Sequence, residues 1–196
     1  VLVRLKRMGY ADGVDLVGAP YDWRFFRFDE YPHVDDWYAA TRRLIETASQ
    51  RAGRPVVLLS HSMGGLMVYR LLDRLGEEFC RRHVARWISL STPWLGTAKA
   101  VAAAFPGDDL DLPLARLLVR GLVRTMETNV LLYPTGARRF GDAPVLVVNS
   151  TGTSYTAENL TEAYRLVGRT FAQRARRIAA SGHGALLEKW NFTIPH

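Results

Sequence analysis

The ten residues from Val56 to Gly65 constrain the fold of this chain more than any other stretch. They join an apolar run, VVLL, to the small and polar residues SHSMGG. The aliphatic run follows Pro55 and predicts a strand that is buried on both faces, as a central parallel strand is. Beyond the turn, apolar residues recur at i, i+3, i+4 and i+7 from Val68, which predicts a helix that packs back onto the sheet.

Ser62 lies at the apex of this strand, turn and helix. A tight turn would hold its hydroxyl out at the sheet edge, where the helix N-terminus also presents free backbone N–H groups. The pattern therefore predicts a nucleophile elbow, with the N–H of Met63 as half of an oxyanion hole. Gly64 and Gly65 would let helix and strand approach closely. Ser60 replaces the first glycine of the usual G-x-S-x-G pattern, and the alternatives are an incidental serine or a phosphate-binding turn.

The order of the expected elements indicates an α/β fold. Up to residue 96 these elements are a helix end over 1–9, a strand over 15–19, a helix over 34–52, the strand from residue 56, the helix after the turn and a strand over 84–90. Strands that alternate with helices predict a parallel sheet with helices on both of its faces.

Beyond Gly96 this alternation stops. The expected elements there are short helical pieces, a helix from Pro113, a strand over 145–148 and a long helix over 160–180. We therefore interpret residues 1–96 as a partial α/β core. Residues 97–196 are expected to form an irregular, mainly helical insertion that covers the carboxyl edge of the sheet as a lid.

The charge of the chain favours an anionic partner. The formal net charge is +7 and the sequence pI is about 9.9, carried mainly by arginine, which suits a membrane surface. We expect no nucleic-acid partner, because the arginines are spread over several helices and no helix-turn-helix, finger or RNA-binding signature accompanies them.

Cysteine and asparagine bear on the compartment. The single cysteine, Cys80, cannot form an intramolecular disulfide and is expected to be a small buried hydrophobe. Three of the four asparagines, Asn149, Asn159 and Asn191, begin glycosylation sequons, which favours the secretory pathway, whether secreted, lysosomal or in the endoplasmic reticulum. Histidines, cysteine and acids show no metal-ligand spacing, so we expect no metal and no other cofactor.

Three blocks of sequence together resemble the lecithin:cholesterol acyltransferase family, which includes lysosomal phospholipase A2 and the phospholipid:diacylglycerol acyltransferases. The blocks are GAPYDWR over 18–24, the elbow over 55–65, and ISLSTPWLG over 88–96. Residues 145–155 and the helix after them resemble the cap of that family more loosely. The chain departs from the family pattern at Ser60, where a glycine is usual, and at Leu95, where a second glycine is common.

The resemblance implies an α/β-hydrolase core with a cap inserted after the strand over 84–90, and an acyl-enzyme mechanism. Ser62 would attack a phospholipid ester and pass the acyl group to a sterol, a diacylglycerol or water. The catalytic Asp and His of the family lie C-terminal to the cap, so we expect both beyond residue 196. Asp142 and His183 follow Ser62 in the right order, but Asp142 precedes a strand where this fold has its acid after one, and His61 would point away from Ser62.

Two further questions stay open at the level of sequence. The chain is either the nucleophile-bearing part of an enzyme, or a non-catalytic hydrolase-like module that binds lipid or a partner, or an inactive fragment lacking its Asp and His. The helix from Pro113 would carry Leu114, Leu117, Leu118 and Leu122 on one face and Arg116, Arg120 and Arg124 on another. Such a helix would either make peripheral membrane contact or pack its leucines against the sheet with its arginines in water.

Overall fold

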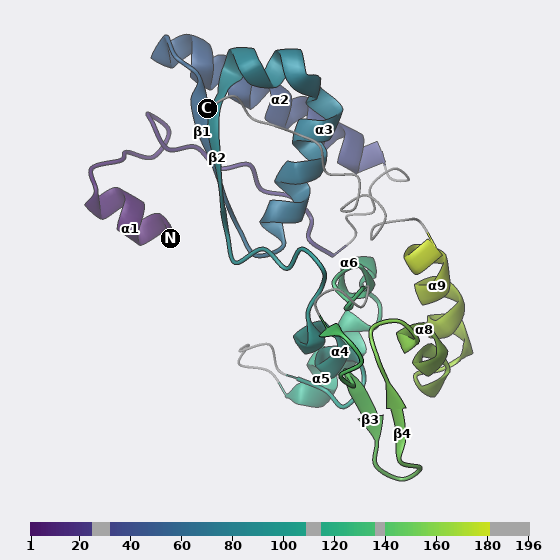
Figure 1. The fold of residues 1–196 in the computed structure, drawn as a ribbon. Coiled ribbons are helices and arrows are strands. Elements are labelled where there is room, and N and C mark those ends of the chain that lie inside the picture. The colour runs from purple at the N-terminus through teal and green to yellow at the C-terminus, as the bar shows by residue number, and fades with distance from the viewer. Residues whose placement is uncertain (25–31, 109–114, 136–139, 181–196) are drawn as a thin grey trace. The chain divides into compact units, whose positions relative to one another are not determined.

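The structure is a computed structural model that describes residues 1–24, 32–108, 115–135 and 140–180 (Figure 1). The described residues divide into two compact units. The first unit lies within residues 1–22 and 32–92, and the second within 23–24 and 93–180. Among the helices that the structure describes, none combines the length and the hydropathy that a bilayer-spanning segment requires.

A parallel pair of strands forms the centre of the first unit. β1 (Val56–His61) pairs with β2 (Val84–Leu90), and α3 (Gly64–His83) connects them. The register runs from Val57 opposite Arg86 to His61 opposite Leu90, and α2 (Pro32–Ala52) contacts both α3 and β1 (Figure 1). Parallel strands need such a crossover because the chain must return from the end of the first strand to the side of the sheet where the second strand starts. The predicted strand, turn, helix and second strand are therefore confirmed.

Burial along the two strands differs from the prediction. In β1 buried or half-buried residues alternate with exposed ones. Four large hydrophobic side chains are exposed on the two strands: Val57, Leu59, Ile88 and Leu90. The expectation of a strand buried on both faces is wrong for the described residues. The helices α2 and α3 cover one face of β1, and the alternate side chains point to the other face, as the two-residue period of a strand requires.

The crossover helix α3 buries its apolar residues close to its N-terminus. Leu66, Met67, Leu71 and Leu72 are each at most 2% exposed. Gly76 has φ 78°, which interrupts the helix after three turns. Cys80 is buried as predicted, and burial raises the pKa of its thiol to about 11.

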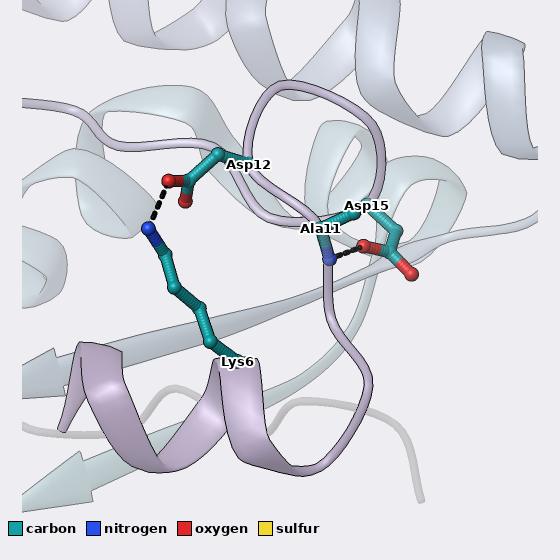
Figure 2. Close-up of polar contacts among 4 residues, drawn as sticks. All are labelled: Lys6, Ala11, Asp12 and Asp15. Atoms are coloured by element: carbon teal, nitrogen blue, oxygen red, sulfur yellow. Dashed lines mark hydrogen bonds and ion pairs between the residues drawn. The ribbon is translucent and has the colours of Figure 1, made fainter.

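The predicted strand over 15–19 is wrong. After α1 (Leu2–Arg7) the chain closes hydrogen bonds on itself. The Ala11 N–H donates to Asp15 Oδ1 at 2.7 Å (Figure 2). The Gly13 N–H donates to the Leu16 carbonyl at 2.9 Å. Lys6 forms an ion pair with Asp12 across the same turn (Figure 2). Backbone groups that are satisfied within a local turn do not join a sheet ladder.

The described residues of the second unit are mainly helical and contain one hairpin. Its elements are α4 (Ala98–Ala104), α5 (Arg116–Val123), α6 (Glu127–Leu131), β3 (Leu146–Val148), β4 (Thr153–Tyr155), α8 (Leu160–Ala163), the 3₁₀-helix η1 (Tyr164–Leu166) and α9 (Arg169–Ala180). β3 and β4 pair antiparallel. The single long helix predicted over 160–180 is wrong, because the chain turns at Gly168, whose φ is 135°.

Aromatic rings hold the core of the second unit together. Phe105, Tyr133, Tyr164 and Phe171 form a chain of edge and tilted contacts with centroids 5.8 to 6.4 Å apart. The Nδ2 of buried Asn129 donates to the Ala100 carbonyl and to Tyr133 Oη at 3.2 and 3.3 Å, so these polar groups are satisfied inside the core.

Candidate active site

Ser62 occupies the turn between β1 and α3 with a backbone conformation that is uncommon for a side-chain-bearing residue. Its φ is 54°, in the left-handed region, which costs on the order of 1 kcal/mol for a non-glycine residue. Two backbone hydrogen bonds hold it there: the Ser62 N–H donates to the Leu90 carbonyl at 2.8 Å, and the Gly65 N–H donates to the Ser62 carbonyl at 3.0 Å. The side chain is exposed, as expected for a nucleophile elbow.

The N-terminus of α3 supplies hydrogen-bond donors next to Ser62. Met63 precedes the helix with φ −55° and ψ −27°, and its carbonyl accepts from the N–H groups of Leu66 and Met67. Within the described part of the chain, the N–H groups of Met63 and Gly64 donate no hydrogen bond, as is usual for the first turn of a helix. Two free donors and the positive end of the helix dipole therefore lie beside the Ser62 hydroxyl.

The two glycines after the turn differ in what they permit. A Cβ at Gly65 would lie 1.8 Å from Thr92 Oγ1, so only a glycine allows the helix to pass the segment that follows β2. A Cβ at Gly64 would meet nothing closer than 3.9 Å, which is ordinary van der Waals contact. The prediction that both glycines serve close packing is thus confirmed for Gly65 and wrong for Gly64.

Ser60 is integrated into the strand pair. Its side chain is buried, and its Oγ accepts a 2.9 Å hydrogen bond from Trp87 Nε1 on β2. Ser89 Oγ on β2 and Thr92 Oγ1, just after this strand, lie 2.7 Å apart and share a hydrogen bond. Sequence reasoning treated Ser60 as a tolerated replacement of glycine and missed the bond to Trp87, because nothing in the local spacing pairs these two residues.

A cavity of about 370 Å³ lies beside β1 in the first unit. Its walls come from α2, α3, β1 and the segment from Val17 to Tyr21, and include Trp37 and Gly64. Tyr21 packs edge-on against Trp37 with centroids 6.0 Å apart, and burial raises the pKa of the Tyr21 hydroxyl. Ser62 is not among the lining residues, so we do not assign this cavity to the substrate.

The candidate bases and acids from the sequence are His61, Asp142 and His183. His61 and Asp142 are exposed, the latter in the turn before β3, and His183 lies outside the described residues. His83 is half-buried, with its ring 4.8 Å from that of Phe79. Within the described residues the Ser62 hydroxyl makes no hydrogen bond, and no group of three histidines, cysteines or acids could hold a metal ion.

Comparison with known proteins gives consistent matches. The family model described as lecithin:cholesterol acyltransferase matches residues 1–176. Lecithin-cholesterol acyltransferase-like 1 of Arabidopsis thaliana is 33% identical over 168 residues, which cover 83% of this chain and 39% of that protein. The lysosomal phospholipase A and acyltransferase of Mus musculus is 32% identical over 161 residues, or 82% of this chain and 38% of that protein.

A third relative broadens the set. The phosphatidylcholine-sterol acyltransferase of Oryctolagus cuniculus is 30% identical over 132 residues, which cover 67% of this chain and 29% of that protein. The chain thus spans about two fifths or less of the length of these curated relatives.

Proposed function

Because this chain belongs to the lecithin:cholesterol acyltransferase family, we propose that it carries the nucleophile of a serine acyltransferase or phospholipase of lipid metabolism. The observation that carries this proposal is the geometry of Ser62. An exposed serine is held at a left-handed φ between a parallel strand and a helix N-terminus with free N–H donors. That combination is what an acyl-transfer nucleophile needs.

In the proposed reaction the Ser62 Oγ attacks the ester carbonyl of a phospholipid and gives up its proton to a general base. The N–H of Met63 donates to the oxyanion that develops on the former carbonyl oxygen. When the intermediate collapses, the lysophospholipid leaves as an alcohol and takes a proton, and the acyl group stays on Ser62. Water, a sterol or a diacylglycerol then accepts the acyl group and restores the free serine.

We assign the general base and its acid to a His and an Asp C-terminal to the cap, as the family resemblance implies. The position of Asp142 supports this choice, because it lies exposed in a turn before β3 instead of following a parallel strand. The alternative pair of Asp142 and His183 is tested by Asp142→Asn, which we expect to leave the reactivity of Ser62 intact.

We further propose that the core is an α/β hydrolase and that residues 97–196 form its cap. The larger part of the second unit begins at residue 93, shortly after β2, and its described residues lack the strand and helix alternation of the first unit, which supports an insertion at this point. The partners are a phospholipid and an acyl-acceptor lipid, reached through peripheral membrane contact. A lysosomal relative and the exposed sequon at Asn149 support a place in the secretory pathway.

A second candidate is a non-catalytic hydrolase-like module that binds lipid or a partner. It is favoured by one observation, that the Ser62 hydroxyl has no hydrogen-bonded base among the described residues. The two candidates differ in the reactivity of Ser62. A serine without a general base and acid reacts about 10³-fold more slowly than one in a complete triad, or slower still.

A fluorophosphonate probe on the full-length protein tests the proposal. Ser91 is a matched control, because it is also exposed, also follows a strand and has φ 52°, but no helix begins beside it. We expect the probe to label the parent and Ser91→Ala, and to miss Ser62→Ala, which also loses acyl transfer by about 10³-fold or more. Equal labelling of Ser62→Ala would overturn the assignment. Absence of labelling in the parent would favour the non-catalytic module.

A further inference from the structure

The first turn of α3 meets side chains from two other segments of the first unit. Gly64 and Gly65 are consecutive residues of the helix, so side chains at these positions would point about 100° apart around its axis. A Cβ at Gly65 would run into Thr92. A Cβ at Gly64 would instead point to Tyr21 Oη and Ser60 Cβ, both 3.9 Å away. The start of the helix therefore has the segment after β2 on one side and the Tyr21 hydroxyl on another.

Aromatic rings from α2 hold the Tyr21 side chain in this place. The Tyr21 ring packs edge-on against Trp37, with centroids 6.0 Å apart, and Trp37 packs edge-on against the buried Tyr38 at 5.3 Å. The guanidinium group of Arg74 on α3 lies over the Tyr38 ring, 4.8 Å from its centroid, and donates to Asp35 Oδ1 at 2.5 Å. These contacts join Tyr21 to both helices, so its hydroxyl has a defined position beside α3.

The Tyr21 hydroxyl is uncharged next to the helix. Burial raises its pKa above the ordinary value, so the phenol keeps its proton at physiological pH. A phenolate at this place would repel the negative charge that develops when an ester carbonyl is attacked, whereas a neutral hydroxyl does not. The group can therefore support the donors of α3 without opposing an oxyanion.

From these contacts we infer that Tyr21 is a positioning residue for the oxyanion hole: its hydroxyl limits movement of the first turn of α3 and keeps the N–H of Met63 aimed at the carbonyl that Ser62 attacks. The inference rests on the proposed function. Met63 adjoins Gly64, so movement of the helix start at Gly64 also moves the Met63 N–H. The left-handed φ of 54° at Ser62 likewise persists only where the surrounding structure holds it.

The alternative role for Tyr21 is that of an aromatic core residue whose ring matters and whose oxygen does not. Tyr21→Phe separates the two roles, because it retains the ring against Trp37 and removes only the oxygen that faces Gly64. A core role predicts lower stability with an unchanged rate in the folded protein. A positioning role predicts a lower rate in a protein that remains folded.

The first measurement is the rate constant for labelling of Ser62 by a fluorophosphonate in the full-length protein. We expect Tyr21→Phe to lower it about tenfold, less than the roughly 10²- to 10³-fold loss that follows removal of an oxyanion donor. With a short soluble ester, kcat should fall by a similar factor while KM stays level, because the oxyanion forms only in the transition state. Tyr38→Phe is the matched control and should label like the parent, since its hydroxyl is not within 4 Å of the Cβ position at Gly64.

Two further readouts respond to positioning and not to general packing. Because Tyr21 stays neutral, Tyr21→Phe should lower the labelling rate by the same factor from pH 6 to pH 9. The added methyl group of Gly64→Ala would occupy space between the helix and the ring of residue 21. The rate lost through Tyr21→Phe should therefore be smaller in the Gly64→Ala background than in the parent.

Hydrogen exchange tests the helix start without any chemistry. The N–H groups of Leu66 and Met67 donate to the Met63 carbonyl at 3.0 and 3.4 Å, so their exchange reports on the first turn of α3. We expect faster exchange at these two amides in Tyr21→Phe than in Tyr38→Phe, with urea midpoints close to that of the parent in both.

Four results would overturn the inference. They are equal labelling of Tyr21→Phe and the parent, a slower rate that Tyr38→Phe shares, loss of folded protein in Tyr21→Phe, and unchanged exchange at Leu66 and Met67. A pH profile of altered shape would also contradict it, because Tyr21 would then be an acid or base in the reaction. Failure of the proposed function is a different result, since the parent itself would then not be labelled.

Discussion

The indole N–H of Trp87 donates a 2.9 Å hydrogen bond to Ser60 Oγ, and so ties the strand that leads into the Ser62 turn to its parallel neighbour. Ser60 is buried two residues before Ser62, and Trp87 lies on β2. The position that usually holds a glycine in this pattern therefore holds a buried hydroxyl with a partner. A buried hydroxyl is tolerated when it is hydrogen-bonded.

Removal of this bond is expected to destabilise the protein. Trp87→Phe leaves the Ser60 hydroxyl buried without its donor, which costs about 1 to 3 kcal/mol of unfolding free energy. Ser60→Ala in the Trp87→Phe background should cost less than the same change in the parent, because the hydroxyl is then already unpaired. Urea unfolding of the four proteins in this double-mutant cycle gives the coupling directly. Strict additivity of the two changes would show that the hydrogen bond contributes nothing.

Gly65→Ala is expected to be among the most damaging small changes in the first unit. The new methyl group would lie 1.8 Å from Thr92 Oγ1 and must displace either the helix or the segment after β2. Overpacking of this kind costs about 1 to 3 kcal/mol, measured as the shift in the urea midpoint. The displacement should also slow fluorophosphonate labelling of Ser62, because Gly65 donates to the Ser62 carbonyl.

Gly64→Ala is the matched comparison for this prediction. Its added methyl group meets ordinary contacts at 3.9 Å, and its φ does not need a glycine. Alanine is the better helix former by up to about 1 kcal/mol, so stability should stay level or rise slightly. Equal losses in Gly64→Ala and Gly65→Ala would contradict the steric argument.

The buried thiol of Cys80 predicts a loss of stability at alkaline pH. Burial raises the pKa of the thiol from 9.0 to about 11, so the unfolded chain releases this proton at lower pH than the folded one. Folding stability from this group is present below about pH 9 and is lost as the pH rises towards 11. Urea unfolding at several values between pH 8 and pH 10.5 should show a steeper decline for the parent than for Cys80→Ala. Parallel curves would mean that the thiol is not shielded.

Local spacing determined a large part of the fold. The strand from Val56, the turn at Ser62 and the following helix were predictable, because an apolar run, a set of small residues and a helical repeat each follow from the covalent order of the chain. The strand over 84–90 was predictable for the same reason. The three sequence blocks also identified the family, whose model matches residues 1–176.

Tertiary structure decided which faces of these elements are covered. A repeat of apolar residues shows that an element is amphipathic, but α5 carries both valines and leucines, and its packing on α4 selected Val119 and Val123 for burial. The same holds for Arg124, which donates to the Ala104 carbonyl at the end of α4 from 20 residues away. Local spacing contains no information about such neighbours.

The region around Ser62 shows the same division. The residue types SHSMGG determined that a tight turn with free helix N–H groups would form, since these are properties of the backbone between a strand and a helix. The bond from Trp87 to Ser60, and the contact that makes Gly65 indispensable and Gly64 replaceable, exist because β2 and Thr92 lie beside the turn in space. Packing contacts between segments that are distant in sequence arise only when the chain folds, and they therefore lie beyond what the order of residues reveals.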